Sequence, residues 1–316
     1  MGMLIDGQWV ANEDDARKKS GRFNRADAQF RNWISADSDA EFAAAAGRYH
    51  LYVSNACPWA HRTLIVRRLK KLEDLISVSY VAPLMLERGW ELPSGADPVN
   101  DATAMYEVYR RARPDYTGRC SVPVLWDKAQ GAIVSNESSE IIRMFNSAFD
   151  AFGDADLDLY PGPLRSEIDA VNDRVYNAIN NGVYKSGFAS AQEVYEDAVT
   201  TLFEALDEME ERLDRQRYLM GTKLTEADWR LFTTLVRFDA VYFGHFKCNL
   251  KRITDYPNLS NYLRALYQMP GIAETVHLEE CKAHYYGSHR GVNPTGVVPA
   301  GPDIDLNQPH DRDRFA

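Results

Sequence analysis

The first pattern in the chain is that of a β-α-β unit. In residues 49–54, apolar side chains alternate with more polar ones, which is the period of a half-buried strand. Residues 60–72 then place apolar side chains at helical spacing, and residues 75–81 predict a second strand. Such a unit has parallel strands and a right-handed crossover. We expect the outer face of the helix to carry its basic residues: Arg62, Arg67, Lys70 and Lys71.

A long irregular segment separates this unit from the next one. Residues 83–118 contain several prolines and glycines and are too long for a plain connection, so we interpret them as a functional insertion. Order returns with two short strands, at residues 121–126 and 131–134, and with a helix at residues 138–145. The order up to this point is therefore β-α-β followed by β-β-α.

The second half of the chain shows only helical patterns. An acidic stretch without periodicity, residues 150–163, precedes it and is interpreted as a domain boundary. Thr225 and Asp228 have the spacing of a capping box, which predicts the start of one helix. The predicted helices span residues 164–181, 190–214, 226–243, 257–268 and 272–285.

The two ends of the chain lack a sustained period. Residues 1–47 carry scattered aromatic side chains among many charges, and we expect this arm to wrap around a domain through them. Residues 287–316 are rich in glycine and proline and form either a clasp on the surface or a disordered tail. Between the arm and the tail, we expect a first domain at residues 48–150 and a helical domain at residues 160–286.

The composition is that of an ordinary globular protein with two domains. The 316 residues are 45% hydrophobic and 26% charged, which excludes disordered, collagen-like and disulfide-rich proteins. A formal net charge of −10 removes the electrostatic basis for binding nucleic acid or an anionic membrane. No stretch approaches the roughly 18 to 20 apolar residues of a membrane span, and residues 1–17 are acidic where a signal peptide would be basic and then apolar. We therefore expect a cytoplasmic protein whose partners are small molecules or other proteins.

Cys57 is the most informative residue for chemistry. It stands between the first strand and the following helix, and Pro58 suits a first helical turn. A thiol at a helix N-terminus meets the positive end of the helix dipole and free backbone N–H groups, which favour the nucleophilic thiolate. The alternative is a cysteine that only packs in the core. Because Ala60 occupies the place of a second redox thiol, an external thiol would have to resolve a mixed disulfide formed on Cys57.

Three motifs and the order of elements carry a resemblance to a known family. The motifs are Cys57-Pro58-Trp59-Ala60-His61-Arg62, Asn180-Asn181-Gly182-Val183-Tyr184, and the stretch from Tyr285-Tyr286 to Asn293-Pro294-Thr295-Gly296. From about residue 20 to residue 302, the chain resembles the glutathione transferase superfamily, and more closely the glutathionyl-hydroquinone reductases of the Xi class. The resemblance implies a thioredoxin-like N-terminal domain followed by an all-helical C-terminal domain.

The resemblance also implies a glutathione site in the first domain. Val122 matches the residue before the family's cis-proline, whose backbone pairs with the cysteinyl part of glutathione. Glu137 and Ser138 match the pair that holds the γ-glutamyl end. Trp90 matches the tryptophan that covers glutathione, and Arg119 lies where a basic side chain meets the glycyl carboxylate.

These positions also have purely structural interpretations. Pro123 is then an edge-strand proline, Ser138 a simple N-cap, Trp90 a core residue and Arg119 a solvated surface charge. The basic helix face near residues 64–71 is explained by solvation better than by membrane binding.

Two tyrosines match those of the family's hydroquinone pocket: Tyr184 and Tyr285. A phenol can donate to or accept from a quinol oxygen, and its ring offers a stacking face. Tyr242, His284 and Tyr286 are candidate neighbours. Because the chain contains 17 tyrosines, a structural role for each is the alternative.

The resemblance implies that the Cys57 thiolate attacks the sulfur of a glutathionylated hydroquinone, releases the hydroquinone and keeps glutathione as a mixed disulfide. A second glutathione then releases oxidised glutathione. The expected assembly is a homodimer without a metal. Two alternatives are an Omega-like thiol transferase or dehydroascorbate reductase, and a non-catalytic binding protein with this fold. A metal site at His277, Cys281 and His284 is a further alternative that lacks an evident fourth ligand.

Overall fold

The structure is a computed structural model that describes residues 2–11, 21–23 and 25–315. The predicted arm therefore lies partly outside the described residues, at positions 1, 12–20 and 24. Among the described residues, those within Met1–Asp15 and Ala26–Asp158 form one compact unit, which we call unit 1. Those within Ala16–Arg25 and Leu159–Ala316 form unit 2.

Unit 1 contains the four-stranded sheet that the two sequence patterns predict. Its strands are β3 (Tyr49–Val53), β4 (Ser77–Tyr80), β7 (Val124–Asp127) and β8 (Ala132–Ser135). The order across the sheet is β4-β3-β7-β8. β3 is parallel to β4 and antiparallel to β7, and β7 is antiparallel to β8. The parallel β-α-β unit is thus confirmed.

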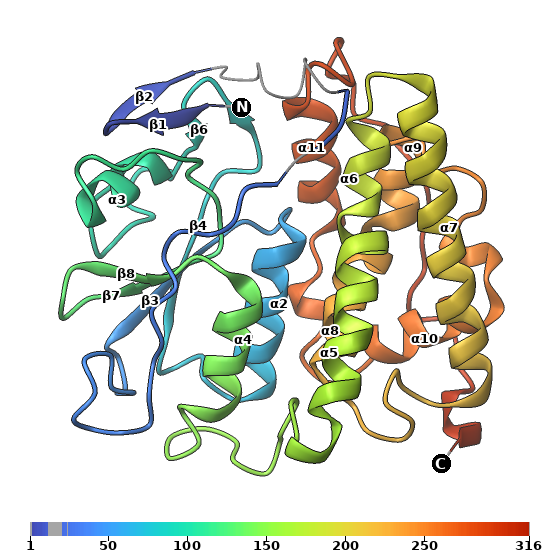
Figure 1. The fold of residues 1–316 in the computed structure, drawn as a ribbon, viewed down its shortest axis with the longest axis horizontal. Helices are drawn as coiled ribbons and strands as arrows, with labels where there is room; N and C mark the ends of the chain where they lie inside the picture. The colour runs from blue at the N-terminus through green and yellow to red at the C-terminus, as the bar shows by residue number, and fades with distance from the viewer. Residues whose placement is uncertain (1, 12–20, 24, 316) are drawn as a thin grey trace. The chain divides into compact units, whose positions relative to one another are not determined.

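Two helices of unit 1 contact each other beside this sheet, α2 (Pro58–Leu69) and α4 (Ser138–Ser147), as Figure 1 shows. Every residue of β3 is buried, so the prediction of a half-buried strand is wrong. The polar residues of β3 have partners inside the unit: His50 Nε2 lies 2.9 Å from Ser79 Oγ, and the Tyr52 hydroxyl donates to Asp97 Oδ1 at 2.8 Å. A central strand covered on both faces can carry polar residues when each one is hydrogen-bonded.

Two basic residues that the sequence analysis placed outside, one within α2 and one at its C-cap, are buried. Arg62 is 1% exposed, and its Nη1 donates to Ser138 Oγ at 3.4 Å. Lys70 is 0% exposed, and its Nζ donates to Asp150 Oδ1 at 2.9 Å and to the Leu157 carbonyl at 2.8 Å. The helical period cannot distinguish a solvated cation from a buried one with acceptors, because the acceptors lie 76 to 87 residues away in the chain.

The segment at residues 83–118 contains more regular structure than its composition predicts. β5 (Met85–Leu86) pairs with β6 (Gly89–Trp90) in a short hairpin, and α3 spans Met105–Ala112. A second unpredicted hairpin lies near the N-terminus, where β1 (Met3–Ile5) pairs with β2 (Gln8–Val10). Strands of two or three residues are too short for alternation to be recognised, which is why both hairpins were missed.

Unit 2 is helical, as predicted, and two of its helices continue through π-helical stretches. α5 (Arg165–Arg174) leads through η2 (Val175–Asn180) into α6 (Gly182–Gly187). α8 (Glu226–Arg237) leads through η3 (Phe238–Tyr242) into α9 (Phe243–His245). The other α-helices are α7 (Gln192–Arg215), α10 (Pro257–Tyr267) and α11 (Leu278–Ser288). Four short 3₁₀ helices complete the described elements: η1 (Gly162–Leu164), η4 (Ile253–Asp255), η5 (Ala273–Thr275) and η6 (Arg312–Phe315).

The predicted capping box forms at the start of α8. The backbone N–H of Thr225 donates to Asp228 Oδ2 at 2.8 Å, and its hydroxyl donates to the same oxygen at 3.2 Å. Asp228 Oδ1 accepts from the Leu219 backbone N–H and from the Tyr262 hydroxyl, both at 2.8 Å. The cap therefore joins three segments of unit 2 at a buried carboxyl, whose pKa is raised by burial.

Replacing Thr225 by alanine is expected to lower the free energy of unfolding by about 1 to 2 kcal/mol, because it removes an N-cap hydroxyl whose partner carboxyl stays buried. Thr225→Ser keeps the hydroxyl and should restore most of the loss. Urea unfolding followed by far-UV circular dichroism measures the difference. Thr201→Ala, which removes an exposed hydroxyl in the middle of α7, is the matched control, and an equal loss there would contradict the assignment.

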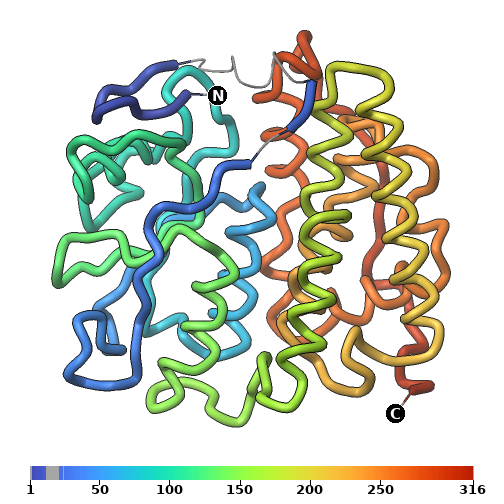
Figure 2. Tube along the Cα trace, viewed as in Figure 1, coloured from blue at the N-terminus to red at the C-terminus, as the bar shows by residue number. Residues whose placement is uncertain are grey.

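The tail packs on unit 2 as a clasp, which decides between the two alternatives for residues 287–315. Gln268 Nε2 donates to the Leu306 carbonyl at 2.7 Å. Arg312 is 1% exposed, and its guanidinium donates to the carbonyl groups of Leu213, at 2.7 Å, and Gln216. Figure 2 shows the tail, at the red end of the colour scale, running along the helices of unit 2 to the C-terminus.

Candidate active site

Cys57 is the N-cap of α2, at the position that the sequence predicts. Its backbone is extended, with φ −78° and ψ 118°, and its Sγ accepts from the Ala60 backbone N–H at 3.5 Å. Pro58 opens the helix, where the missing proline N–H removes no helical hydrogen bond. Cys57 is partly exposed, whereas Cys120, Cys248 and Cys281 are buried. Of the four cysteines, Cys57 is thus the one that combines access with a place at a helix N-terminus.

The Val122–Pro123 peptide bond is cis and lies beside Cys57 in unit 1. The Cys57 thiol donates to the Val122 carbonyl, with a distance of 3.4 Å between Sγ and O. Val122 immediately precedes β7, and its side chain is buried. The structure therefore brings together the proposed nucleophile and the backbone that is expected to pair with the cysteinyl part of glutathione.

The start of α4 holds the third part of the predicted glutathione site. Glu137, not Ser138, is the N-cap, because the Glu137 carboxylate accepts from the Ser139 backbone N–H at 2.9 Å. The interpretation of Ser138 as a simple N-cap is therefore wrong. Ser138 is the first helical residue, and its buried hydroxyl accepts from Arg62 of α2. A cation, a hydroxyl and a helix N-terminus together form surroundings that suit a carboxylate.

Trp90 and Arg119 differ in how firmly the structure holds them. Trp90 ends β6, is 8% exposed and pairs with Met85 across the β5–β6 hairpin. Arg119 is exposed, and its backbone carbonyl accepts from the Tyr116 hydroxyl at 3.3 Å. Burial of Trp90 agrees with core packing as well as with a role in binding, so both predicted roles stay predictions.

Tyr184 and Tyr285 lie in direct contact within unit 2. Their hydroxyl oxygens are 2.5 Å apart, and the Tyr242 hydroxyl lies 3.2 Å from that of Tyr285. The three residues come from α6, α11 and η3, and all are buried. We call them the tyrosine cluster. Burial raises the pKa values of Tyr242 and Tyr285 above the ordinary value, so both phenols keep their protons at neutral pH and can act as donors.

Aromatic and imidazole rings surround the tyrosine cluster. Phe23, from the N-terminal arm, stacks on Tyr184 at 5.8 Å between ring centroids. His284 packs edge-on against Tyr285 at 5.1 Å. The His245 and His289 rings share a hydrogen bond, 3.2 Å between Nε2 and Nδ1, and burial lowers the pKa of His245 to about 4. The surroundings of the cluster are therefore rich in rings, which suit an aromatic ligand.

Sequence reasoning ranked Tyr242 only as a neighbour and gave Phe23 no chemical role. The signal for Tyr242 is the π-helical stretch η3, in which it is the last residue, because π-helices are rare and frequent at functional sites. A single sequence does not show this geometry. Tyr286 packs its ring against His245, with 4.7 Å between ring centroids.

Metal binding is not supported by the residues that the structure describes. No group of three or more His, Cys, Asp or Glu side chains among them could hold a metal ion. His277 lies before α11 as its N-cap, whereas Cys281 and His284 lie within the helix. Among the described helices, none is both long and apolar enough to cross a bilayer.

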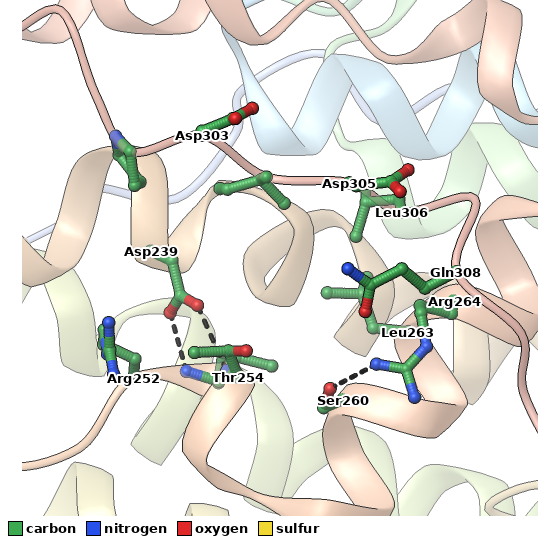
Figure 3. Close-up of a pocket in the computed structure, with 13 residues that line it drawn as sticks. Asp239, Arg252, Thr254, Ser260, Leu263, Arg264, Asp303, Asp305, Leu306 and Gln308 are labelled. Carbon is green, nitrogen blue, oxygen red and sulfur yellow. Dashed lines mark hydrogen bonds between the residues drawn. The ribbon is translucent and has the colours of Figure 1, made fainter.

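A hollow of about 150 Å³ lies under the tail in unit 2 (Figure 3). Asp239 accepts from the backbone N–H groups of Ile253, at 2.6 Å, and Thr254, at 3.1 Å, and Arg264 donates to Ser260. These polar side chains already have partners within the protein. None of the predicted site residues lines the hollow, so we assign it no part in the reaction.

Comparison with known proteins places the chain in a family. Family models described as the N-terminal and the C-terminal domain of glutathione S-transferase match residues 56–148 and 192–265. Glutathionyl-hydroquinone reductase YqjG of Escherichia coli (strain K12) is 53% identical, and the match covers 99% of each chain. Glutathionyl-hydroquinone reductase PcpF of Sphingobium chlorophenolicum is 54% identical, with 96% of each chain covered.

Two further comparisons concern a structure and a more distant relative. The glutathione-bound structure of YqjG matches with a TM-score of 0.89 at 52% identity and covers 99% of each chain. Glutathione S-transferase omega-like 2 of Schizosaccharomyces pombe is 47% identical over 91% of this chain and 96% of its own. The fold is thus a thioredoxin-like N-terminal domain followed by an all-helical one. The chain belongs to the glutathione S-transferase family and, within it, to the glutathionyl-hydroquinone reductases.

Proposed function

We propose that this protein reduces glutathionyl-hydroquinones to hydroquinones with glutathione, through a mixed disulfide on Cys57. The observation that carries the proposal is the partly exposed Cys57 thiol at the N-terminus of α2, in a chain that matches two such reductases over nearly its whole length. Glutathione is the co-substrate, which the glutathione-bound structure of YqjG supports.

Unit 1 supplies the groups that hold glutathione. The Val122 backbone pairs with the cysteinyl part of the tripeptide, beside the thiol that it already contacts. Ser138, Glu137 and the N-terminus of α4 hold the γ-glutamyl end, and the buried Arg62 adds a positive charge next to the Ser138 hydroxyl. Trp90 covers the peptide, and Arg119 meets its glycyl carboxylate. The boundaries that we propose for the two functional domains remain residues 48–150 and 160–286.

The chemistry balances in two steps. The Cys57 thiolate attacks the sulfur of the glutathionyl thioether, the carbon–sulfur bond breaks, and the ring carbon that bore the sulfur ends with one proton in its place. The ring leaves as hydroquinone, and the two sulfur atoms are oxidised to a mixed disulfide. A second glutathione thiolate attacks this disulfide, releases oxidised glutathione and regenerates the Cys57 thiolate. The net reaction consumes one glutathionyl-hydroquinone and one glutathione.

The difficult part of the first step is that carbon is a poor leaving group. The tyrosine cluster offers phenol groups that can assist its departure. If the hydroquinone first becomes its keto tautomer, with a proton added to the carbon that bears sulfur, the departing electron pair is stabilised as an enolate. Tyr285 and Tyr184, whose hydroxyl groups lie within hydrogen-bond distance of each other, hold the quinol oxygens and supply that proton. A cytoplasmic location suits the reaction, since the cytosol keeps glutathione reduced. A homodimer stays the expected assembly.

Mass spectrometry of the protein incubated with a glutathionyl-hydroquinone, in the absence of free glutathione, tests the first step directly. We expect one added glutathionyl group on the peptide that contains Cys57, released hydroquinone in equal amount, and loss of the adduct when glutathione is added. The adduct should be absent from the peptides of Cys120, Cys248 and Cys281, which are buried. Hydroquinone release without any protein adduct would contradict the proposed intermediate.

A thiol transferase is the second candidate, because relatives named omega-like glutathione S-transferases are also similar to this chain. It uses the same Cys57 thiolate but breaks a sulfur–sulfur bond, which requires no proton at carbon. Comparing kcat/KM for a glutathionylated hydroquinone and for a glutathionylated peptide separates the two. A preference for the peptide by a factor of about ten or more would favour the thiol transferase.

A further inference from the structure

The N-terminal hairpin β1–β2 is fixed to residues 116–118 of the same unit by a run of hydrogen bonds. The N–H and carbonyl groups of Leu4 each bond to Gly118 at 2.9 Å. At the turn, Gly7 donates to the Tyr116 carbonyl at 3.1 Å, and the Asp6 N–H donates to Thr117 Oγ1 at 2.9 Å. Both turn residues have left-handed backbones, φ 47° for Asp6 and 74° for Gly7, as a tight hairpin requires. The hairpin is therefore an integral part of the unit.

The side chain that the hairpin presents is Trp9, and it contacts the β5–β6 turn. Trp9 Nε1 donates to the Glu87 carbonyl at 3.0 Å. Its ring stacks on Tyr106 of α3, with 4.9 Å between ring centroids. A Cβ atom on Gly89 would lie 2.8 Å from the Trp9 ring, and Gly89 has φ +71°, so the turn passes against the indole as only glycine can. In Figure 1, β1 and β2 lie next to β6.

The β5–β6 hairpin needs such support to hold a fixed shape. It pairs only two residues on each strand, and a two-stranded ribbon of that length is not stable alone. Its open end is held by a hydrogen bond from the Ala82 N–H to the Glu91 carbonyl at 2.8 Å. Its turn end is held by Trp9 and by Arg88, whose Nη2 donates to Thr103 Oγ1 at 2.7 Å. Trp90 follows directly after Gly89, the residue against which the Trp9 ring packs.

We propose that Trp9 is a positioning residue for glutathione binding, which acts by holding the β5–β6 turn and thereby Trp90. The inference rests on the proposed function, in which Trp90 covers glutathione. Trp9 itself touches no substrate. The N-terminal hairpin thus has a role in ligand affinity, in a segment to which the sequence pattern assigned no chemistry.

The test measures the dissociation constant of glutathione by calorimetry, together with kcat, for Trp9→Ala, Trp90→Ala and the double variant. Trp9→Ala should raise the dissociation constant by about five- to tenfold and change kcat by less than about twofold. The reason is that it removes binding energy that the bound substrate and the transition state share equally. The double variant should bind glutathione as weakly as Trp90→Ala alone, because the effect passes through Trp90. Trp9→Phe, which keeps the ring but loses the Nε1 donor, should lie in between and guards against a fold defect in the alanine variant.

Two further results decide between the inference and the proposed function. Trp33→Ala, at a tryptophan of the same arm that is 47% exposed, is the matched control and should leave affinity unchanged. If Trp90→Ala weakens binding and Trp9→Ala does not, the role of Trp9 is refuted while the proposed function stands. If Trp90→Ala leaves binding unchanged, the assignment of Trp90 is refuted and the role of Trp9 with it. Additive effects in the double variant would also overturn the inference, since they indicate action by separate routes.

Discussion

Replacing Cys57 by serine is expected to lower kcat for a glutathionyl-hydroquinone by about a thousandfold or more. A serine hydroxyl at the N-cap of α2 can still accept from the Ala60 N–H, so the helix should start normally. It cannot form the mixed disulfide. Steady-state release of hydroquinone measures the effect, and calorimetry should show that glutathione still binds.

The other three cysteines provide the control for this result. Burial raises the pKa of Cys120 to about 12 and raises that of Cys248 as well, so neither is a thiolate at neutral pH. Single replacements of Cys120, Cys248 and Cys281 by alanine should therefore leave kcat within about threefold, with any loss appearing as lower stability. Residual turnover of Cys57→Ser above a few per cent would refute a covalent step on this residue.

Elements long enough to show a hydrophobic period could be predicted from the sequence, and the short hairpins could not. The β-α-β unit, the helical second half and the capping box at Thr225 follow from local patterns that the structure confirms. The hairpins at β1–β2 and β5–β6 are stabilised by contacts with distant segments, as the bonds between Leu4 and Gly118 illustrate. Such elements have no local signal because their stability arises from tertiary packing.

Burial of polar residues was the second property that the sequence did not reveal. His50, Arg62 and Lys70 look like surface residues by pattern, yet each is buried with hydrogen-bond partners supplied by other elements. Their burial depends on where Ser79, Ser138 and Asp150 come to lie, which alternation along one segment does not encode. The wrong prediction of their exposure did not change the predicted fold, because these residues lie within correctly predicted elements.

The candidate site divides in the same way. Cys57 could be found from its local context of strand, proline and helix, and the structure places it as the N-cap with a contact to Val122. The partnership of Tyr184 with Tyr285 spans 101 residues and came only from the family resemblance. Trp9 had no signal of either kind, since its role depends on a glycine turn 80 residues further along the chain.

Replacing Tyr285 by phenylalanine is expected to lower kcat for a glutathionyl-hydroquinone by about a hundredfold, the usual contribution of a general acid. Tyr285 is the central member of the tyrosine cluster, because its hydroxyl lies within hydrogen-bond distance of both Tyr184 and Tyr242. Burial raises its pKa, which keeps the proton in place through the neutral range. Its removal eliminates a proton that the departing carbon needs, while the ring that packs in the cluster remains.

The choice of substrate shows whether that loss arises from proton transfer. Reduction of a glutathionyl disulfide uses the same Cys57 thiolate but protonates no carbon, so Tyr285→Phe should leave that rate within about twofold. Tyr256→Phe, which removes a buried phenol hydrogen-bonded to Asp207 outside the cluster, is the matched control and should affect neither substrate. An equal fall for both substrates would mean that the hydroxyl supports the shape of the site instead of the chemistry. The two substrates share glutathione but differ in the atom that leaves, which is carbon in the hydroquinone conjugate and sulfur in the disulfide. If Tyr285 donates the proton, its replacement lowers kcat only for the substrate whose leaving atom is carbon.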